Sequence, residues 1–435
     1  MLTPTRRWFL GAGALISAGL TGCGASERSP RRRTLTALVP DDGGTWVIEA
    51  AAERYGRSSG TPVRLRRVPP DAYEAELGAA LDGDAGGPDL VFHWGSGSIR
   101  TAAEEYRVTD LHDLMLDRPE LGRSYLPAAL TGGHVNERPY GVPVRGTRPV
   151  LLFYDRTLFA DLGLRPPADW TTLRRAAARL TKAGVTPFAL AGADPSAELM
   201  WLAYLVERLG GPEVFGRIQA GDYTQWDHPA VLRAAREVTS LAEDGAFGDD
   251  FADVSATGGS ATARFARGRA AMHLMDSREH AALVDRFPAF ARGQLGWLPF
   301  PAVEGGKGDP KNLIGTPAGY LSAGDLTGGR GEVLDFLEEF STPEHTDALL
   351  AAGEVPVTVA AARRLGASPH PEFTRFQYEL VRDAPVFTLN WEQAVHPVWR
   401  AALRGEVADL FAGRSTPRGF VRNLRERRVA AAQPG

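Results

Sequence analysis

The segment from Tyr140 to Asp155 reads YGVPVRGTRPVLLFYD, and its second half, 150–154, is a continuous apolar run. Such a run is typical of a strand that is buried on both faces of a sheet. Elsewhere, short apolar runs alternate with segments of helical periodicity. Strands are predicted at 35–39, 62–68 and 89–92, and helices at 46–55, 73–81, 231–241 and 333–340. Strands that alternate with helices predict an α/β protein with a parallel sheet covered on both faces.

The composition is that of an ordinary folded protein. The chain has 435 residues, of which 43% are hydrophobic and 23% are charged, and its formal net charge is −4. At about 100–200 residues per domain, this length predicts two domains. A mildly acidic chain lacks the basic surface that sequence-independent nucleic-acid binding requires, so we expect no nucleic-acid partner.

The N-terminal residues have the features of an export signal. Arg6 and Arg7 precede an uncharged, mostly apolar run over 8–20. This run is shorter than the ~20 residues of a membrane-spanning helix, and it suits a signal peptide. The paired arginines followed by Trp8 resemble a twin-arginine export signal, although paired arginines also occur in general secretory signals.

The run is followed by Cys23, which is the only cysteine of the chain. The sequence LTGC over 20–23 resembles the bacterial lipoprotein box, in which the cysteine is lipidated and becomes the new N-terminus. We therefore predict a signal peptide over 1–22, lipidation of Cys23 and a polar tether over 23–33. A structural cysteine after an ordinary signal peptide is the alternative.

Catalytic and cofactor motifs are missing from the sequence. There is no phosphate-binding loop, no dinucleotide fingerprint and no His-Glu-x-x-His spacing. Adjacent acids such as Asp41-Asp42 suit a solvated surface or the start of a helix better than a pair that converges on a substrate. We expect no catalytic residues, no metal site and no cofactor.

Several segments, in order, resemble extracellular solute-binding proteins of the carbohydrate type, which serve ATP-binding cassette importers. They are 88–97, 140–155 with 158–164, 265–275, 298–301 with 305–308, and 387–393 with 411–417. The resemblance implies a two-lobe fold of the periplasmic-binding-protein type (type II), with a hinge and a ligand cleft between the lobes. It also implies a protein that captures a mono- or oligosaccharide and delivers it to permease subunits. Together with the signal sequence and Cys23, this predicts a lipid-anchored protein on the extracellular face of the membrane. A monomer is expected.

The resemblance also suggests where the chain passes between lobes. Crossings are expected at 140–146, 315–322 and 354–359. The first lobe would comprise 34–144 and 321–355, and the second 145–320 and 356–435.

Candidate ligand-binding residues follow from the chemistry of sugar recognition, which needs aromatic faces and charged hydrogen-bonding groups. Trp94 follows a predicted strand, where open α/β sheets place ligands. Arg145 lies in the first expected crossing and Tyr320 in the second. A core tryptophan and a structural ion pair are the alternatives for Trp94 and Arg145.

The second expected lobe supplies the other candidates. Trp391 resembles the stacking platform of related proteins, and Glu392 stands next to it. Asp276 follows the predicted strand over 271–275 and is a ligand or a helix N-cap. Many relatives carry Gly-Ser-Trp where this chain has Asp276-Ser277-Arg278, and Ser196 stands where some relatives carry an aromatic residue.

This departure suggests that Asp276 and Arg278 bind a more polar, charged or smaller ligand. Two other functions remain open from the sequence alone. One is a surface-anchored carbohydrate-active enzyme, which would need a convergent acid pair. The other is a sensory partner that presents a ligand to a membrane receptor without transport.

Overall fold

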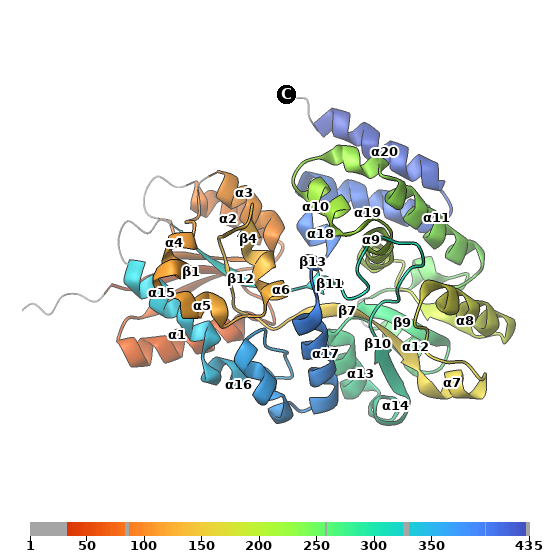
Figure 1. Ribbon diagram of the computed structural model, residues 1–435, viewed down its shortest axis with the longest axis horizontal. Coiled ribbons are helices and arrows are strands. Elements are labelled where there is room, and N and C mark those ends of the chain that lie inside the picture. The colour runs from red at the N-terminus through yellow and green to blue at the C-terminus, as the bar shows by residue number, and fades with distance from the viewer. Residues whose placement is uncertain are drawn as a thin grey trace, which may run out of the picture.

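The chain folds into two lobes, each built around its own β-sheet (Figure 1). The computed structural model describes residues 33–82, 87–105, 107–256, 259–324, 330–395 and 397–431. The predicted signal peptide and the lipidation site at Cys23 lie outside these residues. Helices and strands alternate along much of the described chain, and the predicted α/β class is confirmed.

The first lobe contains a five-stranded sheet in the order β2-β1-β3-β12-β6. Its strands are β1 (Leu35–Pro40), β2 (Val63–Val68), β3 (Leu90–His93), β6 (Val142–Pro143) and β12 (Tyr320–Ala323). β1 is parallel to β2 and β3, whereas β12 is antiparallel to β3 and β6. The sheet is therefore mixed and not parallel as predicted, because β6 leads the chain out of this lobe and β12 brings it back.

Helices surround this sheet (Figure 1). They are α1 (Thr45–Ser59), α2 (Tyr73–Leu81), α3 (Ser96–Glu104), α4 (His112–Asp117), α5 (Pro119–Arg123), α6 (Pro127–Leu130), α15 (Arg330–Glu338) and α16 (Pro343–Ala351). A short hairpin of β4 (His134–Val135) and β5 (Arg138–Pro139) lies beside α3.

The second lobe contains a sheet in the order β13-β11-β7-β9-β8, with β10 also paired to β7. Its strands are β7 (Arg148–Asp155), β8 (Thr186–Ala189), β9 (Ala270–Asp276), β10 (Leu295–Leu298), β11 (Leu313–Thr316) and β13 (Phe387–Leu389). β7 contains the apolar run 150–154, and Val150 to Phe153 are fully buried. The run therefore forms the buried strand that its sequence predicts.

Helices cover this second sheet as well. They are α7 (Arg156–Asp161), α8 (Trp170–Lys182), α9 (Pro195–Gly210), α10 (Pro212–Gln219), α11 (Pro229–Glu243), α12 (Ser260–Ala266), α13 (Arg278–Arg286), α14 (Pro288–Gly293), α18 (Trp391–Ala394), α19 (Pro397–Phe411) and α20 (Pro417–Ala431). α9 is buried along its length, from Ala197 to Leu209. It is the central helix of this lobe.

The segments that pass between the lobes lie side by side. The backbone N–H of Val144 donates to the carbonyl of Gly319 at 2.7 Å, which joins the β6–β7 connection to the β11–β12 connection. The N–H of Thr147 donates to the carbonyl of Val355 at 2.9 Å, which ties the segment after α16 to the first of these connections. The two crossings thus lie side by side, and a segment of the first lobe is hydrogen-bonded to one of them.

Two separate hydrophobic clusters underlie the two lobes. The segment 357–365, assigned to the second lobe from the sequence, contributes Val357, Ala361 and Leu365 to the hydrophobic cluster of the first lobe. Helix α17 (Pro371–Asp383) places Phe373 in the cluster of the second lobe, but Tyr378 and Val381 in the cluster of the first lobe. We therefore propose a later return to the second lobe than residue 356, because α17 spans both lobes.

Candidate functional site

A cavity of about 150 Å³ lies where the second lobe faces the first, and we call it the cleft pocket. The start of α9, the junction of β9 and α13, and the start of α18 form its walls. Its lining residues are Ser196, Leu199, Met200, Ala203, Asp276, Arg278 and 390–393. The first lobe reaches this region at α3, since a side chain on Gly97 would meet the carbonyl oxygens of Gln393 and Ala394 at 2.9 Å.

The cleft pocket brings together four residues that the sequence selected: Asp276, Arg278, Trp391 and Glu392. Arg145 and Trp94 belong to the first lobe. Tyr320 lies in the core of the first lobe, away from the cleft pocket.

Asp276 and Arg278 form one unit at the end of β9. The carboxylate of Asp276 accepts hydrogen bonds from the backbone N–H of Arg278 at 2.9 Å and from its Nη2 at 2.7 Å. Burial favours a raised pKa for Asp276, but the hydrogen bonds and the charge of Arg278 outweigh burial and lower this pKa. The Asp276 side chain is 12% exposed and that of Arg278 is 65% exposed, so the guanidinium is the member that solvent and a ligand can reach.

Arg145 and Asp42 form the corresponding unit in the first lobe. Arg145 is 6% exposed, and its guanidinium carbon lies 4.2 Å from the centroid of the Phe92 ring. Its Nη1 donates to Oδ2 of Asp42 at 2.8 Å. Arg145, which we expected to contact the ligand, is instead buried beneath the loop after β1 and holds Asp42 in place.

Asp42 is a candidate site residue that the sequence analysis did not select. Its side chain is 23% exposed, directly after β1. Burial would raise its pKa, but the hydrogen bond and charge of Arg145, together with the N–H of Gly44, lower it. Its position in the sequence could have indicated it. Asp42 follows β1 as Trp94 follows β3, and the carboxyl ends of these two neighbouring parallel strands lie at the same edge of the sheet.

Trp94 is held at this edge by aromatic contacts. Its ring packs edge to face against Tyr73, at 5.1 Å between centroids, and against Phe92, at 5.6 Å. The residue is only partly buried. The position after β3 agrees with the location predicted for a ligand-facing tryptophan, and the contact with bound ligand stays a prediction.

Trp391 is more deeply embedded than a stacking platform would be. It is 2% exposed, and its ring stacks on Phe215 at 4.4 Å with an interplanar angle of 6°. Trp226 adds an edge-to-face contact at 5.7 Å. Trp391 therefore forms the floor of the cleft pocket and is at the same time a core residue.

Glu392 is half-buried and forms an ion pair with Arg404 of α19. The same arginine also approaches Asp194, before α9, at 3.4 Å. Glu392 thus lines the cleft pocket while its charge is compensated within the second lobe.

Tyr320 corrects one prediction. The residue is fully buried, and its hydroxyl donates to the backbone carbonyl of Ala129 at 2.7 Å. Gly132 lies so close to Tyr320 that a side chain at this position would collide with it. Tyr320 is a core residue of the first lobe, because the strand that carries it is buried between β3 and β6.

The described part of the chain contains neither a metal-binding cluster nor a membrane-spanning helix. No group of three or more His, Cys, Asp and Glu side chains there is arranged to hold a metal ion. None of the helices described is sufficiently long and apolar to span a bilayer.

Comparison with protein families identifies the chain. The family described as bacterial extracellular solute-binding protein matches residues 39–345. The chain therefore belongs to this family of binding proteins, and the resemblance noted in the sequence is confirmed. A comparison with curated proteins gave no match.

Solved structures share the whole two-lobe fold. The bacterial solute receptor AcbH, described as having an exclusive preference for β-D-galactopyranose, has a TM-score of 0.76 at 16% identity, covering 92% of this chain and 99% of its own. The GacH receptor of Streptomyces glaucescens, solved with acarbose, has a TM-score of 0.65 at 20% identity, with coverages of 91% and 97%. A structure from work on xylan utilization by Caldanaerobius polysaccharolyticus has a TM-score of 0.72 at 23% identity, with coverages of 91% and 99%.

Proposed function

We propose that this protein captures a neutral mono- or oligosaccharide between its lobes and delivers it to the permease subunits of an ATP-binding cassette importer. One observation carries the proposal. The first lobe presents the carboxylate of Asp42 and the second lobe presents the guanidinium of Arg278, and each is fixed by a more deeply buried partner. The charge of Asp42 acts on Arg278 across the cleft.

This arrangement suits a ligand rich in hydroxyl groups. A hydroxyl can donate to the Asp42 carboxylate and accept from the Arg278 guanidinium, and hydrogen bonds to charged groups are stronger than those between neutral groups. A ligand that contacts both lobes stabilises the closed state, which is what a transporter can recognise.

The pairing of charges favours a neutral ligand over a charged one. Asp42 pairs with Arg145, Asp276 with Arg278, and Glu392 with Arg404. An ionic ligand would have to compete with these pairs, whereas a neutral sugar can add hydrogen bonds to them. Structural relatives whose descriptions mention galactopyranose, acarbose and stachyose support the assignment to sugars.

The same charges argue against hydrolysis in the cleft. A glycosidase needs a carboxylic acid that stays protonated near neutral pH, and therefore a raised pKa. The pKa values of both Asp42 and Asp276 are lowered instead. The family is one of binding proteins, which agrees with this physical argument.

Export and anchoring complete the proposal. The family is extracellular, which supports an exported protein. We infer lipidation at Cys23 and attachment of a monomer to the outer face of the membrane, with the twin-arginine route as one way out of the cell. Palmitate labelling of the native chain and of Cys23→Ser, followed by membrane fractionation, tests this anchor.

The test of sugar capture is a thermal-shift screen of the chain from Ser26 to Gly435 against mono- and oligosaccharides. A ligand at a hundred times its Kd stabilises the native state by about 2.7 kcal/mol. Arg278→Ala should weaken binding of the active sugar at least tenfold, because it removes the exposed donor of the cleft. The matched control is Arg382→Ala, whose arginine pairs with its neighbour Asp383 on α17.

Trp391→Ala cannot test sugar binding by itself, because the buried, stacked tryptophan also supports the core. We expect this variant to lose about 3–5 kcal/mol of stability. Trp94→Ala, at a partly exposed position, is the better test of stacking. Failure of every sugar to stabilise the native chain, or release of product from a polysaccharide, would overturn the proposal.

A further inference from the structure

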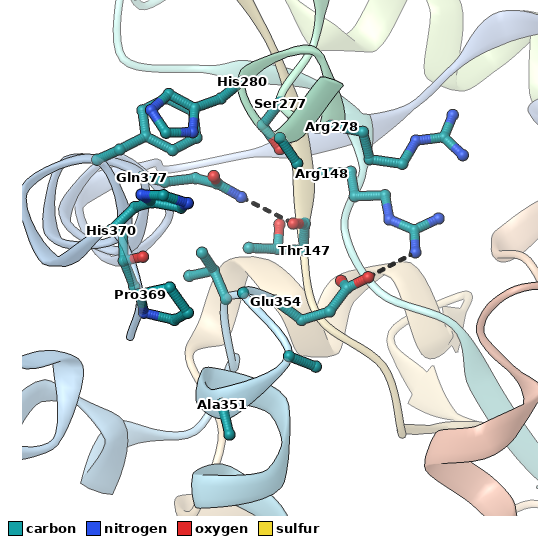
Figure 2. A pocket seen from close by; sticks show the side chains of 16 residues that line it. Thr147, Arg148, Ser277, Arg278, His280, Ala351, Glu354, Pro369, His370 and Gln377 are labelled. Carbon is teal, nitrogen blue, oxygen red and sulfur yellow. Dashed lines mark hydrogen bonds and ion pairs between the residues drawn. The ribbon is translucent and has the colours of Figure 1, made fainter. Parts of the chain in front are cut away.

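A second cavity, of about 210 Å³, lies at the link between the lobes, and we call it the hinge pocket. Figure 2 shows it from close by. Thr147 and Arg148 line it from the first crossing, and 353–355 line it from the segment after α16. The starts of α13 and α17 close it on the side of the second lobe. It is distinct from the cleft pocket, but Arg278 lines both.

Two buried polar side chains that line this pocket have no hydrogen-bond partner among the described residues. Ser277 is 6% exposed and His280 is 7% exposed. The ring of His280 stacks on Phe373 at 3.9 Å, which fixes its orientation without using its nitrogens. Burial, reinforced by His370, lowers the pKa of His280 to about 4, so the ring is neutral at neutral pH and offers one N–H.

The remaining polar groups around the pocket are mostly hydrogen-bond donors. The Nε of Arg148 is buried and has no partner among the described residues, while its Nη2 donates to Glu354 at 2.9 Å. The side-chain amide of Gln377 is already committed to the carbonyl of Thr147 at 2.8 Å. Among the lining residues Glu354 is the carboxylate, and Arg148 compensates it.

Two helix N-termini also point to an anion. α13 begins after Ser277 and α17 begins after His370, and neither of these N-cap residues makes a side-chain capping hydrogen bond. Both N-cap residues line the hinge pocket. The N–H of Arg278 at the start of α13 already donates to Asp276, and α17 begins with Pro371, which has no N–H. What these helices contribute is therefore the positive end of the helix dipole, which favours negative charge nearby.

We infer that the hinge pocket binds a small oxyanion, a phosphate or a carboxylate group, through the Ser277 hydroxyl and the His280 ring, beside the starts of α13 and α17. Glycine, proline and apolar residues complete the walls, so the donors face a confined space. A ligand of this size fits the cavity better than a sugar oligomer does.

Occupation of the hinge pocket is coupled to the cleft by its position. The crossing at Thr147 and Arg148 lines it, together with residues 353–355, which are hydrogen-bonded to that crossing, and the crossing must change its backbone angles when the lobes move. Arg278 is shared with the cleft pocket, so an anion beside it also acts on the proposed sugar site. The structure has this pocket formed while the lobes touch at α3 and α18, so the anion should favour that state and raise sugar affinity. Only this effect on affinity depends on the proposed sugar function.

Calorimetric titration of the native chain with inorganic phosphate, and separately with acetate, tests the site. We expect saturable binding of at least one anion, and the comparison of the two shows which group is preferred. Ser277→Ala should weaken binding at least tenfold. His280→Phe should do the same, because it keeps the ring packed against Phe373 and removes the N–H. His112→Phe, at an exposed position of α4, is the matched control and should bind as the native chain does.

Absence of binding by either anion at millimolar concentrations would overturn the inference, as would equal binding by the native chain and Ser277→Ala. If His280→Phe fails to fold, Ser277→Ala decides the result. Asp42→Asn separates the two sites, since Asp42 does not line the hinge pocket and its loss should weaken the sugar far more than the anion. Anion binding without any sugar ligand would refute the proposed function alone, and sugar binding without an anion would refute the hinge site alone.

Discussion

Charged residues of the cleft work in pairs in which one member is buried and the other faces solvent. In the first lobe the buried member is Arg145, and in the second it is Asp276. The exposed members therefore have opposite charge, Asp42 on one side and Arg278 on the other. A buried partner fixes each exposed group in position before a ligand arrives, which reduces the entropy lost on binding.

Asp42→Asn tests the first of these pairs. It leaves the buried guanidinium of Arg145 without its carboxylate, and the Nε and Nη2 of Arg145 already have no partner among the described residues. Loss of one member of a fully buried pair costs about 3–5 kcal/mol, and partial exposure of Asp42 reduces this to about 2 kcal/mol. Urea unfolding at neutral pH measures the change. Glu53→Gln, which breaks an exposed pair with Arg57, should change stability by less than about 0.5 kcal/mol.

The pH dependence of this pair has a defined sign. The folded pKa of Asp42 is lowered, so its contribution is complete above the ordinary aspartate pKa and is lost as the pH falls through the lowered value. Asp42→Asn should lack this acid-side loss. Identical acid unfolding profiles for the native chain and Asp42→Asn would contradict the assignment.

At the scale of elements, α9 lines the cleft pocket with its first turns and also buries three ionisable side chains. It is buried on all sides from Ala197 to Leu209, yet this stretch contains Glu198, Glu207 and Arg208. Arg208 compensates Glu207 and donates to the carbonyl of Asn312 at 3.0 Å. Glu198 is 1% exposed, and its Oε2 has no partner in the described structure.

Glu198→Gln should stabilise the protein at neutral and alkaline pH. Burial raises the pKa of Glu198 to about 8, although Arg414 opposes this. The stabilising effect of the bound proton is present below the unfolded pKa and is lost as the pH rises from there through about 8. The amide stays neutral throughout, so the variant should gain about 4 kcal/mol near pH 8 and nothing near pH 4.

Urea unfolding at several pH values measures this difference. The control is Glu243→Gln, at an exposed position of α11. Parallel stability curves for Glu198→Gln and the native chain would show that Glu198 is ionised in the folded protein.

The local sequence pattern predicted helices and strands well where the hydrophobic periodicity of a segment alone determines its secondary structure. The expected helix over 73–81 is α2 with the same bounds, and the apolar run 150–154 lies within β7. Residue exposure was harder, because it depends on segments far apart in the chain. Tyr320 is buried against Ala129, which is 191 positions away, and nothing local to Tyr320 indicates that contact. The sequence placed Arg145 near the cleft, but it could not predict the ion pair with Asp42, which is 103 positions away.

At the scale of the whole molecule, the lobes touch on one side of the link. The side-chain amide of Gln219 in α10 donates to the hydroxyl of Ser96 in α3. Arg400 of α19 lies 3.8 Å from Glu74 of α2. α3 and α18 approach one another in the upper half of Figure 1, and α16 and α17 lie in the lower half. These polar contacts between lobes stabilise the arrangement without a ligand.

Removal of both contacts should shift the ligand-free protein towards an open state. We expect Gln219→Ala combined with Arg400→Ala to increase the radius of gyration measured by X-ray scattering. Sugar affinity should fall about fivefold, because the closed state that binds sugar becomes less stable relative to the open state by about 1 kcal/mol. Arg418→Ala, at an exposed position of α20, is the control. An unchanged radius of gyration would mean that the contacts do not hold the lobes together.

The order of strands in the first sheet has a consequence for the biosynthesis of the protein. β12 sits between β3 and β6, although it is made after almost the whole second sheet. A growing chain therefore cannot complete its first lobe until the ribosome has passed residue 323, and the edges of β3 and β6 that pair with β12 lack a partner until then. Such late pairing between distant segments slows folding and prolongs exposure of apolar surface. A fragment that ends before β12 should therefore be degraded or aggregate.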